Sequence, residues 1–196
     1  MSKVVIELYT GRCNFGYSCA GGLANIIRYW DIPDGTDVPI PKVIEGSQGF
    51  RSTTNVRLDI MSAIYVIKSV IDNTNSGKIS KPGQVNAYGV SEYFYKVVSH
   101  KWLNKWQENG WMSTGYKGSP PRPIENRDLW EQFIETQKEL RGIGACLKLL
   151  NDVHDVKSYA DWIFKANDLA LEAAKSTDLI ADEKWEVLCK NIENRR

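Results

Sequence analysis

The chain has 196 residues, which is enough for one domain with a sizeable core. Hydrophobic residues make up 42% and charged residues 25%, the proportions of an ordinary globular protein. The formal net charge is only +1, which argues against strong, sequence-independent attraction of the whole surface to nucleic acid.

Two features bear on where the protein works. The sequence contains no run of about 18 apolar residues, so we expect neither a membrane span nor a membrane partner. A first strand is expected almost at the N-terminus with no signal-peptide pattern before it, so we expect a cytoplasmic or nuclear protein that is not secreted. The cysteines match no zinc-binding spacing and are expected to be free thiols: Cys13, Cys19, Cys146 and Cys189.

The first part of the chain predicts a three-stranded meander followed by a helix. Segments rich in β-branched residues or entered through turn residues predict strands at 3–10, 23–30 and 43–50. Residues 11–16 are expected to form the turn between the first two strands. From Thr53 to Ile71 the apolar residues recur mostly at three and four positions, which is the period of a helix.

The rest of the chain alternates helices and strands. Strands are expected at 84–88 and 143–150, and helices at 90–98, 100–108, from Asn126 onward, at 159–175 and within 177–196. Because helices separate the last two strands, these strands must enter the sheet by crossovers. The order predicts an α/β protein with a mixed five-stranded sheet, three antiparallel strands plus two crossover strands, flanked by helices. We expect one domain over residues 1–175 and a C-terminal helical extension over 176–196, packed on or next to it.

Five stretches, in this order along residues 3–175, resemble the type 1 ribonuclease H family. They are Ile6 to Thr10 with Gly21-Gly22 and residues 26–29; Thr53 to Ile64; Ser91 to Tyr93 with Trp102, Trp106 and Trp111; Pro123 to Trp130; and Asn167 to Ala170. Each stretch alone is weakly specific, and their common order carries the resemblance. The resemblance implies a ribonuclease H-like fold, which agrees with the predicted order of strands and helices.

The resemblance also implies a site in which four carboxylates hold two divalent ions that activate water and stabilise the leaving oxygen. The first carboxylate position holds Gly11 and the third holds Val90, while Asp59 and Asp168 remain at the other two. Magnesium requires oxygen ligands, and the missing pair includes the one expected to bridge both ions. We therefore expect a degenerate active site with no cofactor, and Mg²⁺ or Mn²⁺ only if residual nuclease activity exists. The family's loop histidine has no clear match: counted without gaps from the fifth strand its position holds Asn151, and His154, three residues further on, could serve.

Other positions imply contacts with nucleic acid. Thr54 and Asn55 match the helix-start segment that contacts the backbone and the minor groove in the family, although the next position holds Val56. Asn14, in the first turn, and Asn126, before a helix, are further candidates.

Residues 95–122 form a basic segment with five basic residues against one acidic residue, a local net charge of +4. Within it, Lys101, Trp102, Lys105 and Trp106 match a basic protrusion that lines a channel for the DNA strand in the family. The alternative is that the two tryptophans, one helical turn apart, pack this helix onto its neighbour.

Three hypotheses follow. The first is a catalytically degenerate ribonuclease H-like protein that binds RNA–DNA hybrid or double-stranded RNA, by its shape and 2′-hydroxyls, without cleaving it. The second is a protein-interaction or scaffold module of a larger complex, such as a retroelement or viral complex. Here the extension's apolar stripe of Trp185, Leu188 and Ile192 would dock on a partner, or else on the protein's own surface.

The third hypothesis is an active metal-dependent RNA–DNA hybrid endoribonuclease with relocated ligands. Replacing Asp59 or Asp168 by asparagine separates it from the first, since an enzyme would lose turnover, whereas a binding protein would lose nothing or even bind more tightly as repulsion of phosphates falls.

Overall fold

A computed structural model of the protein describes residues 3–32, 40–114, 120–150 and 157–193. Its elements are β1 (Lys3–Asn14), β2 (Cys19–Ile32), β3 (Lys42–Thr53), α1 (Asn55–Asn75), β4 (Gln84–Tyr88), α2 (Glu92–Ser99), α3 (Trp102–Glu108), α4 (Arg127–Gly142), β5 (Cys146–Leu149), α5 (Lys157–Lys175) and α6 (Glu183–Glu193). None of the helices in these ranges is long and apolar enough to cross a membrane.

The five strands form one mixed sheet in the order β3-β2-β1-β4-β5. The three N-terminal strands pair antiparallel, with Leu8 opposite Ile27, and β4 joins β1 in parallel, with Leu8 opposite Ala87. The fifth strand continues the parallel half of the sheet beside β4. The predicted mixed sheet of three antiparallel and two crossover strands is therefore confirmed.

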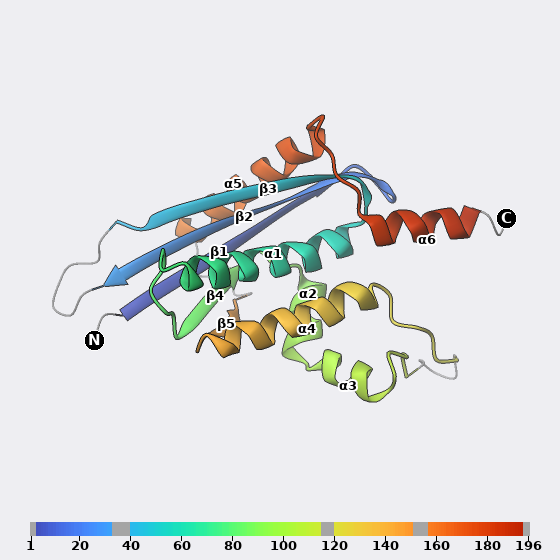
Figure 1. The fold of residues 1–196 in the computed structure, drawn as a ribbon. Helices are drawn as coiled ribbons and strands as arrows, with labels where there is room; N and C mark the ends of the chain where they lie inside the picture. The colour runs from blue at the N-terminus through green and yellow to red at the C-terminus, as the bar shows by residue number, and fades with distance from the viewer. Residues whose placement is uncertain (1–2, 33–39, 115–119, 151–156, 194–196) are drawn as a thin grey trace.

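Helices cover both faces of the sheet, with α5 on one face and α1, α2 and α4 on the other (Figure 1). Because successive side chains of a strand point to opposite faces, β1 contributes to two cores. Leu8 packs with residues of α1 such as Leu58 and Ile64, whereas Tyr9 packs with Ala166 of α5. The long helix α1 is buried along most of its length, which explains the sustained apolar period of its sequence.

The close contact of α5 with the sheet depends on glycines in three neighbouring strands. A Cβ atom added at Gly11, Gly22 or Gly49 would lie 2.1–2.2 Å from backbone atoms of α5. These glycines face the alanine-rich side of α5, so the helix backbone lies directly on the strands. Even an alanine at one of these three positions would force the helix away from the sheet.

The predicted turn at residues 11–16 is wrong in its position. Strand β1 continues through Gly11, which pairs with Ala24, as far as Asn14, and the turn occupies residues 15–18. Gly11 serves close packing of α5 and not a change of chain direction. As a consequence, Arg12 is a strand residue whose side chain points to the face opposite Gly11, toward α1.

The chain beyond α5 packs against the domain. It runs along β3, where the Arg51 N–H donates to the Ile180 carbonyl at 2.9 Å and the Ile180 N–H donates to the Gly49 carbonyl at 3.0 Å. Helix α6 follows, and its Trp185 is 6% exposed. The tryptophan of the predicted apolar stripe therefore faces the protein itself. The side chains of Leu188 and Ile192 lie outside the described residues.

Candidate functional site

A cleft of about 680 Å³ opens where β1 and β4 end and where α1 and α2 begin. It is lined by Arg12, Cys13, Asn14, Asn55, Val56, Asp59, Gly89, Ser91, Tyr93 and Asn167. The sheet order places these segments together, because β4 lies beside β1 and enters parallel to it.

An ion pair occupies this cleft. The guanidinium Nη1 of Arg12 lies 2.7 Å from Oδ1 of Asp59, and it also donates to the Gly89 carbonyl at 3.5 Å. The Asp59 side chain is 9% exposed and that of Arg12 is 30% exposed. Burial raises the pKa of Asp59 above its usual value, while the Arg12 charge and a hydrogen bond with Ser91 oppose this shift.

The family resemblance assigns two of the four carboxylate positions to Gly11 and Val90, and the structure shows the surroundings of each. Gly11 faces α5, and a Cβ atom there would lie 2.2 Å from the backbone C and O atoms of Ala166. Val90 is half-buried and packs against the main hydrophobic core. Gly11 therefore has no room for a side chain, and Val90 contributes an apolar contact.

The family resemblance assigns the fourth position to Asp168, on α5. Asp168 is exposed and does not line the cleft, whereas Asn167 does. The Oδ1 atom of Asn167 accepts a hydrogen bond from the Arg12 backbone N–H at 3.2 Å. Neighbouring residues of a helix point about 100° apart, and of this pair Asn167 is the one that lines the cleft. The side chain that α5 presents to the cleft is therefore an amide that is already bonded to β1.

These residues do not fit a pair of divalent cations. Two such ions need several oxygen ligands and enough negative charge to balance them. The cleft offers the Asp59 carboxylate, which already faces the positive charge of Arg12. Within the described ranges, no group of three or more His, Cys, Asp or Glu side chains is arranged to hold a metal ion. His154 lies outside those ranges.

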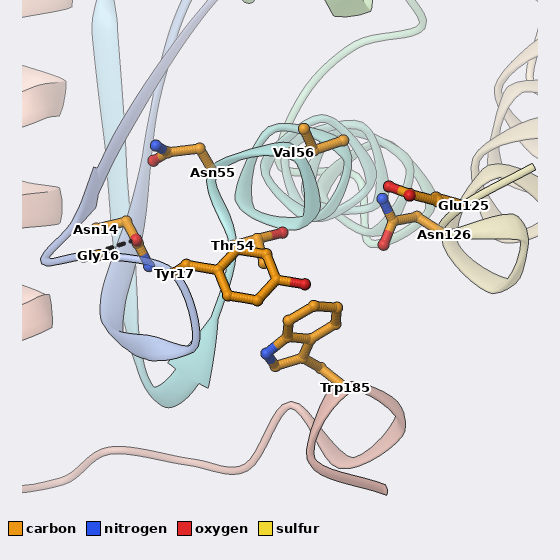
Figure 2. Close-up of a pocket in the computed structure, with 9 residues that line it drawn as sticks. All are labelled: Asn14, Gly16, Tyr17, Thr54, Asn55, Val56, Glu125, Asn126 and Trp185. Atoms are coloured by element: carbon orange, nitrogen blue, oxygen red, sulfur yellow. Dashed lines mark hydrogen bonds between the residues drawn. The ribbon is translucent and has the colours of Figure 1, made fainter. Parts of the chain in front are cut away.

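A second hollow of about 500 Å³ lies next to the first, and Figure 2 shows the residues that line it. It is lined by Asn14, Gly16, Tyr17, Thr54, Asn55, Val56, Glu125, Asn126 and Trp185. The two hollows share three of these residues, Asn14, Asn55 and Val56, so they lie side by side, and we refer to them together as the groove. The structure thus brings together four residues predicted from separate segments to contact nucleic acid: Asn14, Thr54, Asn55 and Asn126.

Most of these polar side chains are held by the fold. Asn14 accepts from the Gly16 N–H at 3.0 Å, and Thr54 caps α1 by accepting from the Arg57 N–H at 3.3 Å. Asn126 has a positive φ of 57° and accepts from Arg57 Nη1 at 3.2 Å. Asn55 is exposed where the two hollows meet. The groove therefore presents preorganised amide and hydroxyl groups.

Sequence reasoning missed the network that anchors the end of the chain beside this groove. Arg57 is 4% exposed and donates to both oxygens of Asp182, Nε to Oδ2 at 2.6 Å and Nη2 to Oδ1 at 2.8 Å. It also donates to both oxygens of Asp128 at 3.0 and 3.2 Å. The pairs span 71 and 125 positions, so no local pattern reveals them.

The same anchoring adds an aromatic wall that the sequence did not predict. Trp185 of α6 meets the exposed Tyr17 edge to face, with ring centroids 5.4 Å apart (Figure 2). Both rings line the second hollow.

The basic protrusion lies apart from the groove, since neither hollow is lined by residues of α3. Lys101 and Lys105 are exposed, while Trp102 and Trp106 are half-buried. Trp106 packs edge to face against Trp130 of α4, with centroids 5.9 Å apart. Trp106 thus contacts α4, Trp102 lies beside Trp106 with ring centroids 6.3 Å apart, and the two lysines are exposed to solvent.

No family model matches the sequence. A ribonuclease H of Caldanaerobacter subterraneus subsp. tengcongensis is 30% identical over 134 residues, which cover 68% of this chain and 72% of the relative. A ribonuclease H of Nitratidesulfovibrio vulgaris (strain DSM 19637 / Miyazaki F) is 36% identical over 133 residues, which cover 68% and 70%.

Two solved structures share the fold. LC9-RNase H1, a type 1 RNase H, superposes with a TM-score of 0.60 at 18% identity, covering 89% of this chain and 74% of that one. LC11-RNase H1, solved in complex with an RNA/DNA hybrid, gives a TM-score of 0.50 at 14% identity, covering 87% and 96%. The sheet order and the flanking helices thus define a ribonuclease H-like protein. With relatives at this identity and coverage, the chain belongs to the ribonuclease H family.

Proposed function

We propose that this protein binds RNA–DNA hybrid or double-stranded RNA in the groove formed by the two hollows and does not cleave it. The observation that carries the proposal is the packing of Gly11 against α5. Because a Cβ atom at this position would lie 2.2 Å from the helix backbone, the carboxylate that the family resemblance requires there has no space. Without it, and with Val90 at a second position, the two-metal chemistry lacks its ligands.

Binding is supported by the polar lining of the groove. Thr54, Asn55 and Asn126 come from the start of α1 and the start of α4, and they present hydroxyl and amide groups on one surface. Duplexes that contain RNA expose 2′-hydroxyls and base-edge acceptors along a wide, shallow minor groove. The hybrid bound to LC11-RNase H1, a protein of the same fold, supports the same class of ligand here.

An active hybrid endoribonuclease is the second candidate, and the name of the relatives favours it. It would need oxygen ligands other than those the cleft presents, with Mg²⁺ or Mn²⁺. The scaffold hypothesis has less support, because Trp185 of the apolar stripe is buried against the protein's own surface.

A binding assay tests the proposal. Fluorescence anisotropy would compare one sequence as hybrid, double-stranded RNA and double-stranded DNA, in EDTA and in Mg²⁺ at equal ionic strength. We expect the RNA-containing duplexes to bind more tightly than DNA in both buffers, and denaturing gels to show them intact.

Two variants make the assay specific. Asn55→Ala, at the centre of the groove, should weaken binding, and Gln132→Ala, exposed on α4 outside both hollows, should leave it unchanged. Binding to none of the duplexes, or equal effects of the two variants, would contradict the proposal.

A further inference from the structure

We propose that Arg12 is the fixed cation of a phosphate-binding site in the cleft, which takes a backbone phosphate of the nucleic acid without a metal ion. This inference rests on the proposed function. It states that Arg12 supplies the positive charge that divalent ions supply in a two-metal site. Arg12 was not among the residues that the sequence indicated.

One nitrogen of the Arg12 guanidinium, Nη1, contacts other residues of the protein, and we infer that the edge formed by Nε and Nη2 is available to a ligand. A guanidinium carries five N–H donors in a planar fork, and the edge formed by Nε and Nη2 matches two oxygens of a phosphate. The contacts of the Arg12 side chain with Asp59 and Gly89 both involve Nη1. Among the described residues, the hydrogen bond of the Arg12 side chain is made by Nη1 and none is made by Nε or Nη2, and the side chain is 30% exposed where it lines the cleft.

The position of this guanidinium is fixed before any ligand arrives. Arg12 lies in the ladder of β1, opposite Leu23, and its backbone N–H donates to Asn167 of α5 at 3.2 Å. Gly11 faces α5, so strand alternation turns Arg12 toward α1, where Asp59 holds its Nη1. A cation that is already oriented loses little conformational entropy on binding, which favours affinity.

The charge balance of the cleft agrees with this role. A two-metal site balances its carboxylates with imported cations, which then face the phosphate. Here the charge of Asp59 is balanced by Arg12, which is part of the chain. A phosphate therefore meets a positive edge and not a bare carboxylate, and no divalent ion is needed to offset repulsion.

The first test is binding of the RNA–DNA hybrid by Arg12→Met, which keeps much of the apolar stem and removes the charge. The wild-type affinity should be the same in EDTA and in Mg²⁺, and Arg12→Met should lower it by about tenfold or more, as expected when a hydrogen bond to a charged group is removed. The slope of log affinity against log salt should also fall by about one. Arg51→Met, an exposed arginine outside both hollows, is the matched control and should bind like wild type.

Two further variants keep the test decisive if Arg12→Met folds poorly. Arg12→Lys keeps the charge without the planar fork, so its affinity should lie between those of wild type and Arg12→Met. Asp59→Asn leaves Arg12 without its counter-charge and should tighten binding severalfold. Wild-type affinity in both Arg12→Lys and Asp59→Asn, or wild-type binding that requires Mg²⁺, would overturn the inference.

A separate measurement distinguishes failure of this inference from failure of the proposed function. Inorganic phosphate, compared with chloride at matched ionic strength, should raise the thermal unfolding midpoint of the wild type but not of Arg12→Met. Equal stabilisation of both proteins would contradict the phosphate site even if the hybrid binds. Absence of hybrid binding together with Arg12-dependent stabilisation would contradict only the proposed function.

Discussion

The helix α1 takes part in two arginine–aspartate pairs through residues only two positions apart, Arg57 and Asp59. Arg57 is 4% exposed, and all of its nitrogens donate, to Asp182, Asp128 and Asn126. Asp59 holds Nη1 of Arg12, whose remaining edge is open to the cleft. One pair is closed by the fold, and the other leaves donors for a ligand.

The difference shows how the same chemistry serves structure in one place and recognition in the other. A buried arginine with every donor satisfied fixes three segments to one another, because breaking it would leave charges without partners in the interior. An arginine with only some of its donors bonded within the protein contributes less to stability and keeps the other donors for an incoming anion. Satisfaction of the donors, and not the presence of an ion pair, separates the two roles.

The largest expected effect on stability comes from replacing Arg57, whose donors are all bonded within the protein. Arg57→Met would leave Asp182 and Asp128 without their partner and should lower the free energy of unfolding by about 3–5 kcal/mol. Urea denaturation measures this decrease. Arg51→Met, which breaks an exposed pair with Glu186, should cost no more than about 1 kcal/mol. Equal costs in the two variants would contradict the distinction between the closed network and ordinary surface pairs.

The next largest effect is expected at Gly11, the residue before Arg12. Gly11→Asp restores the family's carboxylate in sequence, but its Cβ atom would meet the α5 backbone at 2.2 Å. We expect overpacking to lower the free energy of unfolding by about 1–3 kcal/mol or more, with no gain of hybrid cleavage. Gly46→Asp is the control, because a Cβ atom there meets nothing within 4 Å. Metal-dependent cleavage by Gly11→Asp would show that the position still accepts a ligand.

A smaller effect is expected at the protrusion, which lies outside the groove. Replacing Lys101 and Lys105 together by alanine should weaken hybrid binding severalfold and lower its salt dependence by about one for each phosphate that these lysines bind. Anisotropy titrations over a series of salt concentrations provide both values. Lys138→Ala, on the exposed surface of α4, is the control. An unchanged salt dependence in the double variant would remove α3 from the binding surface.

The smallest effect is the pH dependence of the stability that the Arg57–Asp128 ion pair contributes. Burial raises the pKa of Asp128, but its hydrogen bonds and charge interaction with Arg57 outweigh burial and leave the pKa below the usual value. The unfolded chain therefore binds its proton first as the pH falls, so this contribution to stability is present above about pH 4 and is lost below it. Urea midpoints between pH 7 and pH 3 should fall less steeply in Asp128→Asn. A steeper fall in that variant would reverse the sign.

Much of the fold follows from periodicity and from the order of elements. The helical repeat after Thr53 and the β-branched segments predict the mixed sheet, and the absence of carboxylates at Gly11 and Val90 is visible directly. The details that depend on contacts between distant segments were beyond sequence reasoning. Gly11 suggested a turn, because a glycine required by a helix lying on a strand has no local signature.

Arg12 and Asn167 were missed for a related reason. Their importance depends on which face of a strand or helix meets the cleft, and a shift of one position changes that face. In α5, the choice between Asn167 and Asp168 follows from how Ala166 and Ala170 pack on the glycines of the sheet. Sequence reasoning favours the charged residue of such a pair, but the orientation of the helix about its axis determines which side chain lines the cleft.

The most direct test of the account is a cleavage assay under forcing conditions. Labelled RNA–DNA hybrid would be incubated with excess protein and Mn²⁺ for hours, beside Asp59→Asn prepared in the same way. We expect the hybrid to be bound and to stay intact with both proteins. Products formed by the wild type, abolished by EDTA and absent with Asp59→Asn, would show that Asp59 still holds a catalytic metal and would contradict it.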